Sequence, residues 1–124
     1  MFEGKEIKVI FSEEANEVFN ELNRLAGEER MKGVESSFHQ TLLRSIERAI
    51  TLLKDNPFAG NQVPKRQLPE IYEKRYDAEN AWRIELADRW RLIYTITGNK
   101  LEVISFIMSI FDHKNYDKAF GYKH

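Results

Sequence analysis

The sequence predicts an α+β fold with the order β-α-α-β-β-β, in which two N-terminal helices pack on an antiparallel sheet. Three patterns support this. Apolar and polar residues alternate across 81–97, as in two strands joined by a tight turn. Apolar residues recur at helical spacing in two earlier stretches, 13–27 and roughly 34–55. An almost uninterrupted apolar run at 101–111 predicts a central strand covered on both faces.

Length and composition limit the class of protein. The chain has 124 residues, of which 42% are hydrophobic and 31% charged, so we expect one globular domain over residues 1–124. It has no cysteine, which excludes disulfides and thiolate metal sites. No apolar run approaches the roughly 20 residues that a membrane-spanning helix needs, and the first residues show no signal-peptide pattern. We therefore expect a cytoplasmic protein that does not contact membranes.

A first strand is expected at residues 6–11, where apolar and polar side chains alternate. Ser12 then provides an N-cap for the first helix, and two glutamates follow in the first turn, where the helix dipole favours negative charge. The helix is expected to end near Gly27, although residues 28–32 could extend either helix.

The second helix is expected from about Val34 to Asp55. It stops there because Pro57 lacks a backbone donor and disfavours a helical conformation in the residue before it. His39 lies beside the apolar stripe of this helix, where a surface or half-buried histidine is more common than a catalytic one. Residues 58–76 are interrupted by glycine and proline and carry two basic pairs, which predicts an irregular basic loop beside the later hairpin.

The alternation within 82–96 specifies the register of the first hairpin. The apolar rows share a face if the facing pairs are Leu86 and Trp90, Ile84 and Leu92, and Trp82 and Tyr94. A slip of one residue would bury Arg91, so this register should be well specified. The aromatic residues of the hairpin are expected in the core rather than as stacking platforms.

A second turn is expected at Gly98-Asn99, a two-residue hairpin signal. The facing pairs would then be Ile96 and Leu101, Tyr94 and Val103, and Trp90 and Ile107. Residues 112–118 leave the sheet, in our interpretation as a short helical turn, and Phe120-Gly121-Tyr122 closes the chain.

Charge is unevenly distributed, although the formal net charge is only −1. The basic residues in the middle of the chain are Lys65, Arg66, Lys74, Arg75, Arg83, Arg89 and Arg91. A basic sub-surface on a near-neutral protein suits a local anionic partner better than long-range steering. A solvated face with ordinary ion pairs would account for the pattern equally well.

The strand face opposite the core carries the candidate chemistry. Arg83, Glu85 and Arg91 emerge together there, and His113 and Tyr116 follow just past the end of the last strand. Arginine is a permanent phosphate ligand that stabilises developing charge, and histidine moves protons near neutral pH. The set suits phosphoryl chemistry on RNA, with Tyr116 stacking on a base or bonding a phosphate. Glu85 and Arg91 could instead form a simple cross-strand ion pair.

Other kinds of site lack their motifs. The sequence contains no glycine-rich phosphate loop, no metal-ligand spacing and no nucleophile elbow. The three histidines lie far apart, so neither a metal site nor a cofactor is expected.

Three segments carry a family resemblance: NAWRIEL (80–86), WRLIYTI (90–96) and DHKNYDKAFGY (112–122). On this element order they resemble the RelE/ParE toxin superfamily, and more narrowly the RelE-like toxins of archaea and bacteria. The resemblance implies a toxin of a type II toxin–antitoxin module. The implied activity is metal-independent endoribonuclease cleavage of mRNA, typically in the ribosomal A site, by attack of a 2′-hydroxyl on the adjacent phosphate. The implied partner is a cognate antitoxin that wraps and silences the toxin.

The resemblance also implies residue roles. Arg91 matches the arginine that the family places at the scissile phosphate, and Arg83 matches a basic position on the preceding strand. His113 and Tyr116 stand where members have a terminal acid or base and an aromatic residue. Glu85 stands where RelE has a lysine, so it either acts as a general base, as in YoeB-like relatives, or weakens the activity. The cations expected to bind RNA around this site are Lys65, Arg66, Lys74, Arg75, Arg89 and Lys114.

Two other functions remain open. ParE-like members share the fold but bind a topoisomerase and have no nuclease activity, so fold alone does not decide between them. A catalytically degenerate member would act as a binding protein. The combination of Arg91 with His113 favours the nuclease.

Overall fold

The structure of the protein is a computed structural model that describes residues 2–121. In this part of the chain five strands form one sheet, in the order β1-β5-β4-β3-β2. The strands are β1 (Glu6–Phe11), β2 (Asn61–Gln62), β3 (Trp82–Glu85), β4 (Arg91–Gly98) and β5 (Glu102–Phe111). The helices are α1 (Glu13–Met31), α2 (Phe38–Asp55), α3 (Glu70–Tyr76) and α4 (His113–Phe120), with 3-10 turns η1 (Lys65–Gln67) and η2 (Ala87–Arg89).

The predicted α+β class is confirmed, with differences in element order. The strand β2 and the helix α3 were not predicted, and α4 is longer than the single turn expected. The sheet is mixed rather than wholly antiparallel, because β1 pairs with β5 in parallel. The chain between these two strands is long enough for the crossover that parallel pairing requires.

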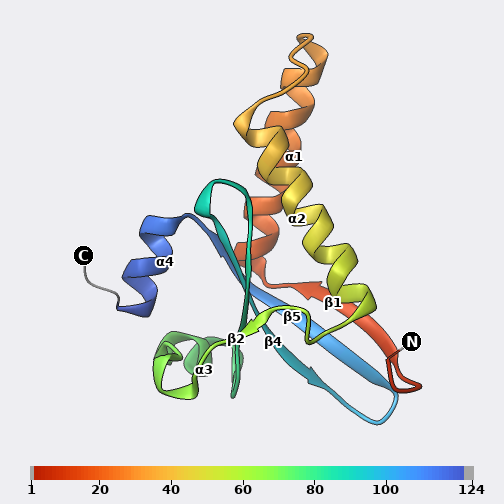
Figure 1. The fold of residues 1–124 in the computed structure, drawn as a ribbon, viewed down its shortest axis with the longest axis vertical. Helices are drawn as coiled ribbons and strands as arrows, with labels where there is room; N and C mark the ends of the chain where they lie inside the picture. The colour runs from red at the N-terminus through yellow and green to blue at the C-terminus, as the bar shows by residue number, and fades with distance from the viewer. Residues whose placement is uncertain (1, 122–124) are drawn as a thin grey trace.

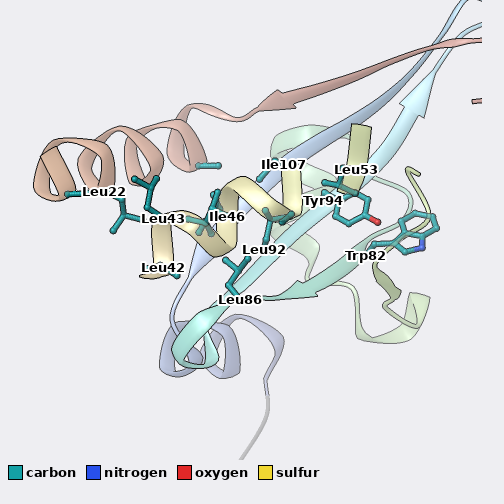
Figure 2. Close-up of a cluster of buried hydrophobic side chains, with 14 residues drawn as sticks. Leu22, Leu42, Leu43, Ile46, Leu53, Trp82, Leu86, Leu92, Tyr94 and Ile107 are labelled. Atoms are coloured by element: carbon teal, nitrogen blue, oxygen red, sulfur yellow. The ribbon is translucent and has the colours of Figure 1, made fainter. Parts of the chain in front are cut away.

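One face of the sheet is covered by α1 and α2, which form an antiparallel hairpin that projects past the sheet (Figure 1). Figure 2 shows the larger core between this hairpin and the sheet. Its labelled members are Leu22, Leu42, Leu43, Ile46, Leu53, Trp82, Leu86, Leu92, Tyr94 and Ile107. Leu92 is 0% exposed, and Trp82 and Tyr94 are also buried, as predicted.

A side-chain cap begins α1 as predicted. The Oγ atom of Ser12 accepts a 3.1 Å hydrogen bond from the N–H of Ala15. The helix continues through Gly27 to Met31, which is the extension that the sequence left open.

The start of α2 differs from the prediction by one turn. The Oγ atom of Ser37 accepts a 3.1 Å hydrogen bond from the N–H of Gln40, so the helix begins at Phe38 rather than near Val34. Its end at Asp55 is the predicted one.

His39 joins the two helices. Its Nδ1 atom lies 3.0 Å from Oε2 of Glu29 on α1, and the other carboxylate oxygen accepts a 2.5 Å hydrogen bond from Ser37. The histidine is half-buried, so its role is the structural one expected.

The β3–β4 register is the predicted one. The facing pairs include Trp82 with Tyr94 and Ile84 with Leu92, and the N–H of Leu86 donates a 2.8 Å hydrogen bond to the carbonyl of Trp90. Alternate residues face opposite sides of a sheet. This register therefore turns Arg83, Glu85 and Arg91 away from the α1–α2 core.

The predicted β4–β5 register is wrong by four residues. Val103 pairs with Gly98 instead of Tyr94, and Tyr94 pairs with Ile107. An irregularity between Ile93 and Tyr94 shifts the register once more. Because the shift is even, Tyr94 and Ile107 still share the core face.

The turn between these strands explains the shift. It is centred on Lys100 and Leu101 rather than on Gly98-Asn99, and the N–H of Asn99 donates a 3.0 Å hydrogen bond to the carbonyl of Glu102. The side-chain oxygen of Asn99 accepts hydrogen bonds from the N–H groups of Leu101 at 2.8 Å and Glu102 at 3.1 Å. This side-chain bonding selects a later turn than the dipeptide signal indicates.

The second face of the sheet is covered by α3, α4 and the segment before β3. Their cluster contains Val63, Tyr72, Ala78, Ala81, Ile93, Met108, Tyr116 and Phe120. The segment predicted as an irregular loop is therefore partly ordered by packing, because Tyr72 of α3 is buried and its hydroxyl donates a 2.9 Å hydrogen bond to Oγ of Ser109. Ile107 and Met108 are buried in different clusters, so β5 is the doubly covered strand expected.

A further cap fixes α4 at the end of β5. The Oδ1 atom of Asp112 accepts a 2.8 Å hydrogen bond from the N–H of Asn115. Tyr122, in the predicted closing segment, lies outside the described residues. Between residues 2 and 121, no helix is both long and apolar enough to cross a membrane.

Candidate functional site

Two arginines from neighbouring strands meet one tyrosine of α4 on the second face of the sheet. Nη1 of Arg83, on β3, donates a 2.7 Å hydrogen bond to the hydroxyl of Tyr116. The guanidinium carbons of Arg83 and Arg91 lie 5.7 Å and 5.1 Å from the centre of the Tyr116 ring. Tyr116 therefore holds both cations beside each other through its hydroxyl and its ring face. We call these three residues the arginine–tyrosine cluster.

Glu85 is an acid that lies close to one member of this cluster. It faces Arg91 across the β3–β4 pair, and its Oε1 atom lies 3.6 Å from Nε of Arg91. The Arg91 side chain is 12% exposed, whereas that of Glu85 is 60% exposed. Glu85 offsets part of the positive charge, and its exposed carboxylate can also accept a proton from a ligand.

The sheet-facing side of α4 carries a second set of groups. His113, Tyr116, Asp117 and Phe120 follow at helical spacing, which places them on one face of α4. Tyr116 is 2% exposed, and its ring stacks on Phe120 with centroids 4.5 Å apart. Tyr116 is therefore a covered residue that orients arginines, and its ring is not presented to solvent for base stacking.

His113 lies beside Arg89 at the tip of the β3–β4 hairpin. Its Nε2 atom is 2.9 Å from Nη2 of Arg89 and 3.0 Å from Oδ2 of Asp117. Arg89 adopts a left-handed backbone conformation with φ of 65°, and its carbonyl accepts a hydrogen bond from Nη1 of Arg91. Arg89 thus links His113 to Arg91. On α4, His113 lies one helical turn before Tyr116.

Among the sequence-predicted site residues, the structure brings together those on β3, β4, η2 and α4. These are Arg83, Glu85, Arg89, Arg91, His113 and Tyr116. Asp117 was missed, because nothing in composition indicates that a helix aspartate is buried. Its position four residues after His113 was the signal that could have found it.

The remaining predicted cations lie outside this set of contacts. Lys65 and Arg66 are exposed on η1, and Lys114 is exposed on α4. On α3, the Nζ atom of Lys74 lies 3.7 Å from Glu70. Arg75, beside it, forms an ion pair with Glu14 of α1. The pKa of Arg75 is raised by its hydrogen bond to Glu14.

No metal site accompanies these groups. Across residues 2–121, no three histidine, cysteine, aspartate or glutamate side chains are grouped so that they could hold a metal ion.

Comparison with solved structures identifies a similar fold. A YoeB/ParE toxin from Agrobacterium tumefaciens matches with a TM-score of 0.54, covering 86% of this chain and 98% of the toxin chain. The chain has a YoeB/ParE-like toxin fold. This match confirms the fold expected from the RelE/ParE resemblance. Because the two sequences are only 16% identical, the match assigns no roles to residues, and those roles are argued from the geometry of this chain. Neither the protein-family models nor the curated proteins that were compared match the sequence.

Proposed function

We propose that this protein is the toxin of a type II toxin–antitoxin module and acts as a metal-independent endoribonuclease on ribosome-bound mRNA. The observation that carries the proposal is the convergence of Arg83 and Arg91 on Tyr116, with His113 one helical turn away. Two permanent cations at one point suit a phosphate, and a neighbouring histidine suits proton transfer to or from ribose oxygens.

The proposed reaction uses the two arginines of the cluster together with His113 and Glu85. Arg83 and Arg91 donate hydrogen bonds to the non-bridging oxygens of the scissile phosphate, where negative charge increases in the transition state. The 2′-hydroxyl attacks phosphorus, and the bond to the 5′-oxygen breaks. His113 transfers the proton between these oxygens. Glu85, whose exposed carboxylate lies beside Arg91, is a second group that can accept a proton from the RNA.

The RNA strand extends beyond the scissile phosphate. Exposed cations that can contact flanking phosphates include Lys65, Arg66 and Lys114, together with Arg89 at the hairpin tip. Lys74 and Arg75 already have acidic partners, so their contribution to RNA binding should be smaller.

The partner implied by this function is a cognate antitoxin, encoded next to the toxin gene. Co-expression with the adjacent small reading frame should yield a stable complex in which RNA cleavage is suppressed. A purified chain that does not bind that product would remove the toxin–antitoxin assignment.

A second candidate is a ParE-like toxin that binds a topoisomerase. One feature favours it: Tyr116 covers the arginines and Glu85 faces Arg91, so both cations already have internal contacts. A catalytically degenerate RelE-like binding protein would fit the same feature.

Cleavage and supercoiling assays separate these functions. Wild-type protein added to a translation extract should cut mRNA within the translated region and leave a 2′,3′-cyclic phosphate on the upstream fragment. The same preparation should not inhibit DNA supercoiling by a topoisomerase. Intact mRNA together with inhibited supercoiling would establish the ParE-like function, and no effect in either assay would favour the binding protein.

A further inference from the structure

A hydrogen-bond donor and an acceptor meet the same nitrogen of His113. Its Nε2 atom is 3.0 Å from Oδ2 of Asp117 and 2.9 Å from Nη2 of Arg89. A guanidinium only donates hydrogen bonds, and a carboxylate only accepts them. Nε2 can therefore bond to Asp117 when it carries a hydrogen, or to Arg89 when it does not, but not to both at once.

The contact with Asp117 is the stronger of the two. Asp117 is 6% exposed and lies one turn after His113 on α4, so the helix backbone fixes their separation. A buried carboxylate needs hydrogen bonds to offset its desolvation. The contact with Arg89 is exposed, where solvent and side-chain entropy weaken it.

We propose that Asp117 is a positioning residue that keeps a hydrogen on Nε2 of His113 and so makes Nδ1 the nitrogen that exchanges a proton with RNA. This inference rests on the proposed function. The 2′-hydroxyl gives its proton to Nδ1 while its oxygen bonds to phosphorus. The bond from phosphorus to the 5′-oxygen breaks, and that oxygen takes the proton from Nδ1. Between these two proton transfers the imidazole ring is positively charged, and its Nε2–H donates a hydrogen bond to Asp117.

Arg89 has a matching role in this scheme. Arg89 contacts Nε2 and not Nδ1, so its departure would free Nε2 from the competing donor. Nδ1 is itself covered, so the side chains around it must also move before RNA reaches it. The Arg89 contact is the exposed one, and a phosphate is a stronger partner for a guanidinium than an imidazole nitrogen is. A phosphate that draws Arg89 away removes the competing donor from Nε2.

The tautomer of His113 tests this inference without a cleavage assay. Nitrogen-15 chemical shifts of the two ring nitrogens, in purified protein at a pH where histidine is neutral, show which one carries the hydrogen. The Nε2–H form should exceed the Nδ1–H form by about tenfold or more in wild type, the scale of one charge-assisted hydrogen bond. Asp117→Asn should abolish most of this preference, whereas Arg89→Gln should retain it.

Two results would overturn the inference: a wild type with the hydrogen on Nδ1, or an unchanged tautomer ratio in Asp117→Asn. Since the first needs no variant, the test remains decisive if Asp117→Asn does not fold. In the cleavage assay, Asp117→Asn should lower kcat about tenfold or more while KM stays within about twofold. If the wild type has the expected tautomer but cuts no RNA, the proposed function fails while the positioning of His113 by Asp117 stands.

Discussion

The hydroxyl of Tyr116 accepts a 2.7 Å hydrogen bond from Nη1 of Arg83, although 33 residues separate the two in the chain. The ring of the same tyrosine lies 5.1 Å from the guanidinium carbon of Arg91. One side chain of α4 therefore orients two cations from neighbouring strands. The geometry of the candidate site depends on where α4 sits.

The N-cap of α4 should accordingly affect the site. Asp112→Ala removes the acceptor for the N–H of Asn115, which should lower the free energy of unfolding by about 0.5–2 kcal/mol. Asp112→Asn keeps a capping oxygen and is the matched control. Urea denaturation measures the stability, and amide hydrogen exchange in α4 should rise only in the alanine variant. Equal exchange in all three proteins would mean that this cap does not hold α4.

Two leucines, one in the core and one in a turn, should differ in how much their truncation lowers the stability. Leu92 is 0% exposed in the core, so Leu92→Ala should cost about 2–5 kcal/mol of unfolding free energy through lost burial and a cavity. Leu101, at the β4–β5 turn, is 81% exposed, and Leu101→Ala should change stability by less than about 0.5 kcal/mol. Similar losses in both variants would contradict the core described here.

Tyr72 should make stability depend on alkaline pH. Burial raises the pKa of its phenol from the ordinary 10.0 to about 12. Between these values the unfolded chain has lost the proton and the folded chain keeps it, so stability falls as pH rises through this range. Tyr72→Phe should weaken that dependence, measured as the urea midpoint against pH. A steep dependence that persists in Tyr72→Phe would assign it to another group, such as Tyr94, whose pKa burial also raises.

Cations with and without acidic partners should differ in RNA binding. Lys65→Ala should reduce the slope of log affinity against log salt by about 0.7, the value for one lost single-strand phosphate contact. Arg75→Ala should reduce it less, because Arg75 already pairs with Glu14. Binding of a short single-stranded RNA at several salt concentrations measures both slopes. A larger change for Arg75 would mean that the RNA follows α3 instead of η1.

The first hairpin and the identity of the site face were predictable from sequence. Alternation across β3 and β4 has one register that keeps Arg91 out of the core, and the structure has that register. The β4–β5 register was not predictable from the dipeptide signal, because the side chain of Asn99 bonds two later N–H groups and moves the turn. Local sequence propensity does not indicate which of the two turn positions the chain adopts.

Other parts of the site depend on contacts between distant residues. The helix α3 forms where the sequence is interrupted by prolines, and Tyr72 packs it against β5. The burial of Tyr116 depends on α4 folding back over β3 and β4, which no periodicity in residues 112–118 specifies. Asp117 was missed for the same reason: its burial comes from tertiary packing.

The rate of mRNA cleavage by Arg91→Ala tests the central claim most directly. Losing one donor that stabilises transition-state charge should reduce the rate by about 10²–10³. Arg44→Ala, which removes an exposed arginine from α2 on the other side of the sheet, is the matched control and should cleave like wild type. On expression, Arg44→Ala should arrest growth as the wild type does, and Arg91→Ala should arrest it much less. An Arg91→Ala protein that cleaves mRNA and arrests growth as the wild type does would show that the arginine–tyrosine cluster is not the catalytic site.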